Sequence, residues 1–598
     1  MGDQGQRERN IVTTARSGFD RRAVINGLAT TAVALGFPAG VSGTAVPLAR
    51  VRPGDAGWPV ADEWAALGRE VGDRLAAVTL PDLAPAEATT LLKNPYYIRD
   101  QAGLTQSSGY LDGWRSTPSA YVVRARDAAD VAAAIRFAAR HRLRLVVKGG
   151  GHSYLGGSNA SNSLLIWTRD LEDIALHDTF VPAGTGAAPV PAVSVGAGCI
   201  WHDVYDRVTT KGGRYVQGGG CVTVGVAGLV QGGGFGSFSK AFGLAAANLL
   251  EAEIVTADGR VRTVNAANDS DLFWALKGGG GGTWGVITRL TLATHDLPMT
   301  AGVVRWRVHA TSDAAFRDLV TAFVALYAAR LMTPHWGEQV RLMTRRRFEV
   351  NMLFQGIEEA TAAAAWADLN ALVAARPADF VVDEPLTFAA LPMRHLWNGD
   401  FVAAHMPGAV VRDPRAGANP AHWWWAGNTA EVAAFWHGYE SLWLPAALLD
   451  PTAQGRLVDA WIASAQHWSA AFHFNKGLAG GAATARAAST ATAMNPQVLD
   501  AFALVIVAMD GDPAYPGFTA VDIADARDDR RRIAAAMADL RHIVPDGGSY
   551  LSECNFALAD WQRACWGEHA LRLEAIKAHY DPGGLFLVHH GIGSARSA

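Results

Sequence analysis

The chain alternates strand-like segments, helix-like segments and glycine-rich loops, and this mixture predicts an α+β protein. Half of its 598 residues are hydrophobic and 18% are charged, a balance typical of a folded protein rather than a disordered one. One hydrophobic core rarely serves so long a chain, so two or three domains are expected. The net charge of −4 indicates no basic surface, and we expect no nucleic-acid partner.

The first 45 residues have the layout of a bacterial export signal. Arg21 and Arg22 precede an apolar run from Ala23 to Val41, and small residues follow. Paired arginines at this place resemble a twin-arginine signal, which predicts export to the periplasm or the medium. Without such a signal, the protein would stay in the cytoplasm. No other apolar run is long enough to span a membrane, so no integral membrane anchor is expected.

Residues 46–115 predict a linker followed by a helical segment, and a strand–helix–strand unit comes after it. Tyr121 to Arg124 is the first expected strand, and Asp127 is a good N-cap for a helix whose apolar residues recur at helical spacing. The second strand, Leu143 to Val147, leads directly into "KGGGHSYLGGSN". A hairpin is expected in "EAEIVTADGRVRTV", where Asp258-Gly259 forms the turn.

Three glycine-rich loops lie between residues 116 and 296. Glycine allows positive φ and lets a ligand approach backbone N–H groups, so several such loops beside strands indicate a cradle for an anionic group such as a pyrophosphate. None of them matches the ATP-binding pattern G-x-x-x-x-G-K-[ST]. "GGGTWG" fits G-x-G-x-x-G, but it follows a helix and opens onto a strand, the reverse of a nicotinamide dinucleotide site.

"VVKGGGHSYLGGSN", "GRYVQGGGCVTVGVAGLVQGGGFGSFSKAF" and "DLFWALKGGGGGTWGVITRLTL" together resemble the FAD-binding domain of the vanillyl-alcohol oxidase superfamily, in its berberine bridge enzyme-like branch. "SYLSECNF" and "WGEHALRLEAIKAHYDPGGLF" resemble the C-terminal segment of that branch. The resemblance implies a two-subdomain PCMH-type FAD-binding domain at 116–296 and a substrate domain at 297–545, whose sheet is covered by helices on one face. A segment at 546–598 would complete the flavin site.

By the same resemblance, FAD is bound covalently at two residues. The histidine after G-G-G is His152, which matches the residue bonded to the flavin 8α-methyl, and "GCVTVG" supplies Cys221 for a second bond at flavin carbon 6. Without these bonds, His152 would be a hydrogen-bonded loop histidine and Cys221 a small buried apolar residue. The other expected cofactor-binding residues come from the same loops: Gly149, Gly150, Gly151, Ser153, Val224, Gly225, Gly228, Gly232, Gly233, Gly234, Gly236 and Val286.

The stretch "YLSE" matches the family position of the catalytic base. Relatives have Y-x-N-Y or Y-x-N-E, so Ser552 departs from the pattern and either Tyr550 or Glu553 is expected as the base. The alternative to a catalytic role is an edge strand in which Tyr550 packs against its neighbours and Glu553 is solvated or forms a salt bridge. His473 and Asn475 are expected in the substrate cavity if they share one face of a strand.

The expected function is that of an FAD-dependent oxidase acting on a small molecule. Hydride would pass from a C–H beside an alcohol of a carbohydrate, a polyol or a secondary metabolite to FAD, and then to O₂ as acceptor, giving H₂O₂. By resemblance, a small Val224 favours the oxidase. The alternatives are a dehydrogenase with another acceptor and a catalytically dead flavin-binding protein. No C-x-x-C spacing occurs among the four cysteines, no metal site is predicted, and Cys554 and Cys565 are expected as free thiols rather than a disulfide.

Overall fold

The computed structural model describes residues 50–518 and 520–594. These residues lie in the second of the two compact units of the chain, Pro47–Ala598, and the description below is of that unit. The predicted export signal at residues 1–45 lies outside the described residues, so export stays a prediction. Within the described ranges, no helix is both long enough and apolar enough to cross a membrane.

A four-stranded sheet carries the first glycine loop. Its elements are β1 (Leu75–Ala77), β4 (Tyr121–Arg124), α4 (Ala128–Arg140), β5 (Arg144–Lys148) and β6 (Ser163–Trp167). The strand order is β1-β4-β6-β5, and β6 is parallel to both β4 and β5. All of β6 is buried, as expected for the central strand of a parallel sheet. The predicted strand–helix–strand unit is confirmed, and the Asp127 side chain caps α4 by accepting a hydrogen bond from the Asp130 N–H.

A five-stranded antiparallel sheet follows. Its strands are β7 (Ile174–Phe180), β8 (Val190–Gly196), β10 (Leu249–Val255), β11 (Val261–Asn265) and β12 (Val286–Ala293), in the order β11-β10-β12-β8-β7. The predicted hairpin is β10–β11, and Gly259 in its turn has φ +74°, a conformation that suits glycine. Between β11 and β12 lie helix α8 (Ser270–Leu276) and the third glycine loop.

Short elements between β8 and β10 carry the second glycine loop. They are α5 (Trp201–Tyr205), a π-helical turn (Asp206–Lys211), β9 (Arg214–Tyr215), α6 (Val226–Gln231) and α7 (Ser239–Phe242). Strand β9 pairs with β13 (His295–Asp296). The loop from 216 to 225 therefore connects a strand to a helix. Its backbone N–H and C=O groups belong to neither element, so they can bond to neighbouring segments.

A nine-stranded sheet forms the other half of the described unit. Its strands are β2 (Ser107–Tyr110), β3 (Trp114–Arg115), β14 (Thr300–Ala310), β15 (Trp336–Met343), β16 (Arg347–Gln355), β17 (Phe380–Pro392), β20 (Ala434–Pro445), β21 (Ala470–His473) and β22 (Ala501–Gly511). The strand order is β17-β14-β16-β15-β21-β22-β20-β2-β3. Only β2 and β20 pair in parallel among these nine strands.

The segment 46–115 is more than the predicted linker and helical segment. It contains the helices α1 (Ala61–Val71), α2 (Pro85–Leu91) and α3 (Pro95–Arg99), but also β1, β2 and β3. Strand β2 has the sequence "SSGY", which lacks the β-branched residues that indicate a strand, and it is held by pairing with β20 far along the chain. Because the large sheet takes strands from both sides of residue 116, the domain boundaries at 116, 297 and 546 stay predictions.

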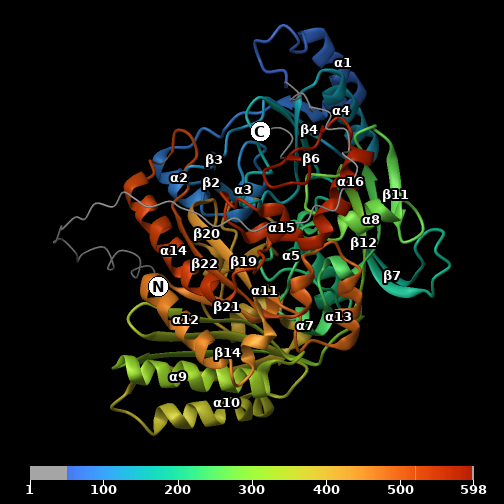
Figure 1. Ribbon diagram of the computed structural model, residues 1–598. Coiled ribbons are helices and arrows are strands. Elements are labelled where there is room, and N and C mark those ends of the chain that lie inside the picture. The colour runs from blue at the N-terminus through green and yellow to red at the C-terminus, as the bar shows by residue number, and fades with distance from the viewer. Residues whose placement is uncertain (1–49, 519, 595–598) are drawn as a thin grey trace, which may run out of the picture. The chain divides into compact units, whose positions relative to one another are not determined.

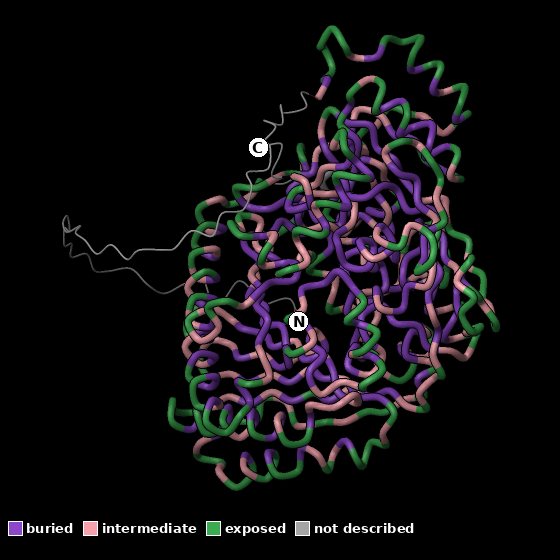
Figure 2. Tube along the Cα trace, turned by 45° about the vertical axis from the view of Figure 1, so that its right-hand side comes forward, coloured by how far each residue is buried: buried purple, intermediate pink, exposed green. Residues whose placement is uncertain are grey.

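Helices cover one face of the nine-stranded sheet, as expected (Figure 1). They are α9 (Asp313–Leu326), α10 (Glu359–Ala374), α12 (Gln454–His467) and α14 (Ile523–Ile543). Alternate residues of β14, namely Val304, Trp306 and Val308, are buried in the core beneath these helices. Figure 2 shows buried residues gathered in the interior and exposed residues along the outer turns of the chain.

The last part of the chain packs beside the third glycine loop. Helices α15 (Trp561–Trp566) and α16 (Ala570–Tyr580) follow the stretch "YLSE". Cys554 and Cys565 are both buried free thiols, as predicted. On α16, the buried Lys577 ammonium donates hydrogen bonds to the Thr283 and Phe586 carbonyls and to Asp581, each at 2.6 Å. This ammonium therefore ties the C-terminal helix to a loop far away in the sequence.

We expect Lys577→Met to lower the free energy of unfolding by about 3–5 kcal/mol, because it leaves the buried Asp581 carboxylate without its cation. The matched control is Lys211→Met, which removes an exposed ion pair with Asp206 and should cost less than about 1 kcal/mol. Urea unfolding followed by tryptophan fluorescence measures both. Equal effects of the two substitutions would contradict the role given to Lys577.

Candidate active site

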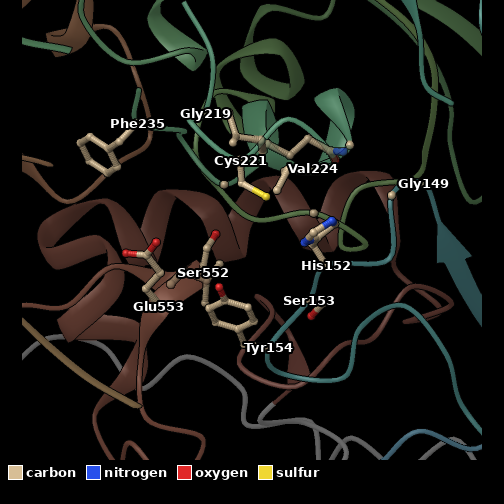
Figure 3. A pocket seen from close by; sticks show the side chains of 18 of the residues that line it. Gly149, His152, Ser153, Tyr154, Gly219, Cys221, Val224, Phe235, Ser552 and Glu553 are labelled. Carbon is tan, nitrogen blue, oxygen red and sulfur yellow. The ribbon is translucent and has the colours of Figure 1, made fainter. Parts of the chain in front are cut away.

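One cavity of about 600 Å³ lies between the glycine loops, the nine-stranded sheet and the C-terminal segment. Its floor comes from all three glycine loops, and its other walls carry polar and aromatic side chains (Figure 3). This volume is in the range of cavities that hold a cofactor or a sizeable organic ligand.

The first two glycine loops touch through their backbones. A Cβ atom added to Gly150 would lie 2.5 Å from the Gly225 nitrogen, and one added to Gly225 would lie 2.6 Å from the Gly150 nitrogen. No side chain fits at either position without moving a loop. This contact sets His152 and Cys221, which follow and precede these glycines, around the same cavity.

Other glycines leave the cavity wall clear. A Cβ on Gly228 would meet no atom within 4 Å, and one on Gly281 would meet none closer than 3.9 Å, although both residues line the cavity. A ligand can therefore lie directly against the backbone of the second and third loops. Several of the predicted cofactor-binding residues line this cavity: Gly149, Gly150, Gly151, His152, Ser153, Cys221, Val224, Gly225, Gly228 and Gly232.

Four predicted cofactor-binding residues are placed elsewhere. Gly233, Gly234 and Gly236 pack against Met494, Leu229 and the Gly218 carbonyl, so their missing side chains make room for protein atoms. Val286 is buried in the core beneath α4, while its neighbours Gly285 and Ile287 line the cavity. The glycine pattern alone does not distinguish a glycine that accommodates a ligand from one that accommodates a neighbouring residue.

His152 and Cys221 meet at a third residue, Thr223. The His152 Nε2 atom lies 3.1 Å from the Thr223 carbonyl oxygen and 3.3 Å from its Oγ1, and Cys221 Sγ lies 3.5 Å from the same Oγ1. Figure 3 shows the sulfur and the imidazole pointing into one space with Val224 beside them. Thr223 is part of "GCVTVG" but was not singled out in the sequence, because a threonine carries no motif signal of its own.

Burial keeps both side chains uncharged. Burial lowers the pKa of His152 to about 4, so its ring is neutral at neutral pH. A carbonyl oxygen can only accept a hydrogen bond, so Nε2 carries the proton and Nδ1 carries the lone pair. Burial also raises the pKa of the Cys221 thiol.

The two residues expected as base alternatives are both engaged. The Tyr550 hydroxyl accepts a hydrogen bond from the Gly234 N–H at 3.3 Å, and burial raises the Tyr550 pKa well above its usual value. Both Glu553 carboxylate oxygens lie 2.6 Å from the Lys476 ammonium. Tyr550 and Glu553 do line the cavity, but one is a poor proton acceptor and the other is held in an ion pair.

A carboxylate that the sequence did not single out, Glu431, also lines the cavity. The Glu431 side chain is open to the cavity, and desolvation by the surrounding protein, together with the Asp510 and Glu553 carboxylates, raises its pKa to about 7, while Lys476 and Arg341 act to lower it. Its carboxylate accepts no hydrogen bond from the described residues. Glu431 lies in a turn just before β20, and nothing in its local sequence marks it as a site residue.

Amide side chains from α6, from β15 and from the turn after β21 line the cavity. His473 and Asn475 line the cavity as expected, although Asn475 lies in a helical turn after β21 rather than on the same strand face. Three lining amides have a buried oxygen without a partner among the described residues: Gln231 Oε1, Gln339 Oε1 and Asn475 Oδ1. Buried polar atoms are normally hydrogen-bonded, so these groups fit a polar ligand in the cavity.

Two segments of this chain match family models. Residues 118–265 match the FAD binding domain, and residues 515–593 match berberine and berberine-like proteins. These ranges include the first two glycine loops and "YLSE".

Curated and solved proteins show the same relationship. The VAO-type flavoprotein oxidase VAO615 of Thermothelomyces thermophilus is 29% identical over 92% of this chain and 93% of its own length. The crystal structure of VAO-type flavoprotein MtVAO615 from Myceliophthora thermophila C1 superposes with a TM-score of 0.74 at 24% identity, covering 91% of this chain and 97% of that one. A glucooligosaccharide oxidase of Acremonium strictum, described with a 6-S-cysteinyl, 8α-N1-histidyl FAD, has a TM-score of 0.59 at 20% identity, covering 82% of this chain and 94% of that one.

The fold and the cavity thus define an FAD-dependent oxidoreductase. The chain carries an FAD binding domain and a berberine-like C-terminal segment, and it is similar along most of its length to a VAO-type flavoprotein oxidase. The open glycine backbone and the unpartnered amide oxygens of the cavity fit a cofactor that offers both a flat ring and polar groups.

Proposed function

We propose that the protein is an oxidase that binds FAD covalently through His152 and Cys221 and acts on an alcohol of a carbohydrate or polyol. The bound FAD would supply a two-electron acceptor for the hydride of the carbon that carries the alcohol, and O₂ would take the electrons to give H₂O₂. The observation that carries the proposal is the meeting of the His152 ring and the Cys221 thiol at the Thr223 hydroxyl, inside one cavity.

The protonation of His152 supports the first bond. Because Nε2 donates to the Thr223 carbonyl, Nδ1 is the nitrogen left to bond a carbon. The glucooligosaccharide oxidase of Acremonium strictum is described with a histidyl and a cysteinyl bond to its FAD. The same pair of residue types at one cavity supports bicovalent attachment here.

We propose Glu431 as the base that takes the proton of the substrate alcohol. A general base works best when its pKa lies near the working pH, and the pKa of Glu431 is about 7. The Glu431 carboxylate accepts no hydrogen bond from the described residues, whereas the Glu553 carboxylate forms an ion pair with Lys476. The ion pair of Lys476 and Glu553 would then position substrate hydroxyl groups.

The cavity wall favours a polyhydroxylated substrate. Polar side chains line it, among them the amides of Gln339 and Asn475, and sugar hydroxyls can form hydrogen bonds with such groups. Trp397 and Trp425 line the same cavity and offer flat apolar faces, which suit the C–H face of a sugar ring. A secondary metabolite with an alcohol or amine is the second candidate, since the same aromatic rings suit an aromatic substrate.

Val224 lines the cavity beside Cys221, and by the family resemblance a small residue at this position supports O₂ as the acceptor. The purified protein would be screened with gluco-oligosaccharides, chito-oligosaccharides and primary alcohols in a peroxide-coupled assay. Peroxide formed in step with product supports the oxidase. Turnover only with an artificial electron acceptor would replace the oxidase with a dehydrogenase, and no turnover with any donor would favour a dead flavin-binding protein.

We expect His152→Ala and Cys221→Ala each to keep FAD on one remaining covalent bond. Peptide mass mapping after acid precipitation should find flavin only on the Cys221 peptide in the first variant and only on the His152 peptide in the second. The double variant should release its flavin into the acid supernatant. Flavin on both peptides in either single variant, or on neither peptide of the unchanged protein, contradicts bicovalent attachment.

We expect Glu431→Gln to slow substrate oxidation by about 10²–10⁴-fold, because glutamine cannot accept the proton. In the unchanged protein kcat/KM should rise with pH through an apparent pKa of about 7, as the carboxylate loses its proton, and this rise should vanish in Glu431→Gln. Anaerobic stopped-flow measurements with the best substrate of the screen give the rate of hydride transfer.

The comparison variants are Tyr550→Phe and Glu553→Gln. If either of them loses the pH-dependent rise while Glu431→Gln keeps it, the base is that residue and not Glu431. A loss of FAD from Glu431→Gln is checked by absorbance before the kinetics, so that a cofactor defect is not read as a base defect.

A further inference from the structure

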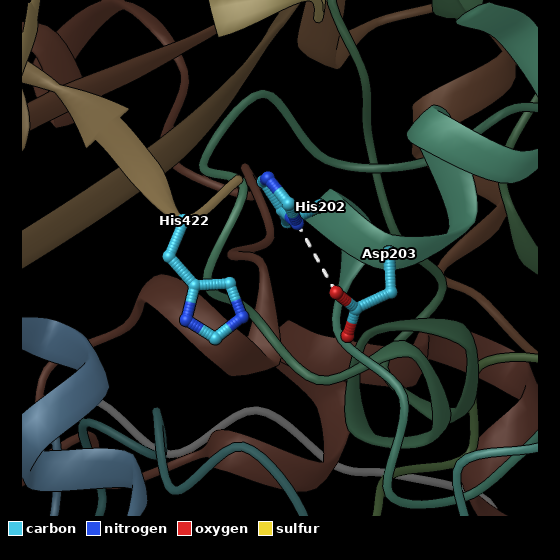
Figure 4. Close-up of side chains that lie close together, drawn as sticks. All are labelled: His202, Asp203 and His422. Carbon is cyan, nitrogen blue, oxygen red and sulfur yellow. Dashed lines mark hydrogen bonds and ion pairs between the residues drawn. The ribbon is translucent and has the colours of Figure 1, made fainter. Parts of the chain in front are cut away.

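A second cluster of side chains packs against the loop that carries Cys221. None of its three members lines the cavity. His202 and Asp203 lie in the first turn of α5, and His422 directly precedes β19 (Trp423–Trp425), which pairs with β18 (Val410–Arg412). One potential ligand atom from each residue lies within 4.8 Å of the others. Figure 4 shows the three side chains converging from the two segments.

The hydrogen bonds of His202 leave one nitrogen facing a carboxylate. Its Nε2 lies 2.9 Å from the Ala421 carbonyl oxygen, which can only accept, so Nε2 carries a proton. Its Nδ1 lies 3.1 Å from Asp203 Oδ1. A neutral ring would place a nitrogen lone pair against a carboxylate oxygen, and that contact is favourable only if a cation lies there, either a proton or a metal ion.

His422 supplies a second nitrogen without a partner. Its Nε2 faces His202 and Asp203 (Figure 4), its Nδ1 lies on the other side of the ring, and neither nitrogen makes a hydrogen bond with the described residues. The Tyr96 ring stacks on the imidazole at 4.0 Å and holds its plane, and the His202 ring stands at 89° to it. A ring that is fixed in orientation with a free lone pair is suited to a metal ion.

The charged groups around the cluster are mostly paired. Arg99 approaches Asp203 at 3.8 Å, but it also lies 2.7 Å from Glu172 and donates to the Gly198 carbonyl. On the other side, Asp413 is paired with Arg415. Asp203 therefore keeps Oδ1 toward His202 Nδ1, while its Oδ2 lies 3.8 Å from the Arg99 guanidinium.

We propose that His202, Asp203 and His422 bind a divalent first-row transition-metal ion such as Zn²⁺. Two imidazoles and one carboxylate are a ligand set that Zn²⁺ uses in proteins, with a water molecule in the fourth position. The Ala421 carbonyl fixes the His202 tautomer, as carbonyls do for metal-bound histidines. The sequence predicted no metal site because the two histidines lie far apart in the chain and show no ligand spacing.

The ion would hold the loop that carries Cys221. On one side, the Trp201 and His202 N–H groups donate to the Val224 and Val222 carbonyls at 3.0 and 2.7 Å. On the other side, the Trp425 indole N–H donates to the Gly220 carbonyl at 3.0 Å. A metal ion bound between α5 and β19 would therefore join the two segments that hold residues 220–224 in place, which is a positioning role.

The test uses purified holoprotein, stripped of metal by chelating resin and dialysed against Zn²⁺. Elemental analysis should find about one tightly bound Zn²⁺ per chain. His422→Ala and Asp203→Asn should each weaken Zn²⁺ binding by at least about tenfold. The matched control is His309→Ala, which removes an exposed histidine paired with Asp383 at 3.0 Å and should leave Zn²⁺ binding unchanged.

A second measurement on the unchanged protein covers variants that fold poorly. Co²⁺ added to the stripped protein should give the visible absorption of a four-coordinate site, and Zn²⁺ should displace it. If the unchanged protein binds neither ion tightly, the cluster is an imidazolium–carboxylate pair and the proposal is wrong. Equal loss in His309→Ala would also overturn it. Both readouts are independent of flavin attachment and of turnover.

Discussion

The backbones of Gly150 and Gly225 approach so closely that neither position has room for a Cβ atom. This contact joins the loop after β5 to the loop before α6, and therefore the four-stranded sheet to the short helices that lie between strands β8 and β10 of the five-stranded one. His152 lies two residues after the first glycine and Cys221 four residues before the second. Their meeting at Thr223 depends on this contact rather than on any direct bond between them.

Two carboxylates that line the cavity, those of Glu553 and Glu431, have different neighbours. Both Glu553 carboxylate oxygens lie 2.6 Å from the Lys476 ammonium, so this side chain is held in an ion pair. Glu431 has no such partner, and desolvation together with Asp510 and Glu553 raises its pKa to about 7. These two acids of the cavity therefore differ in their surroundings: Glu553 is held in an ion pair, and the pKa of Glu431 is raised to about 7.

Local signals in the sequence were enough for the elements that depend on local interactions. Asp127 caps α4 as its position predicts, and the Asp258-Gly259 turn makes the β10–β11 hairpin. The glycine loops and the residues His152 and Cys221 could also be identified, because both lie in motifs with a family likeness. Strand β2 could not, since its sequence "SSGY" becomes a strand only through pairing with β20.

Glu431 and the cluster of His202, Asp203 and His422 depend on segments that meet only in the folded chain. Gly233, Gly234 and Gly236 show the converse, because a glycine pattern does not say whether a ligand or a neighbouring residue fills the space.

The account makes the contact between the two glycine loops the condition for holding FAD. Its most direct test compares the FAD content of Gly225→Ala with that of Gly427→Ala, whose added Cβ would meet no atom within 4 Å. Gly225 has an ordinary negative φ of −70°, so the substitution tests space and not backbone strain. We expect Gly225→Ala to be purified with clearly less FAD per chain, measured by absorbance, while Gly427→Ala keeps its full complement. Full FAD content in Gly225→Ala, with both flavin peptides unchanged, would contradict the account.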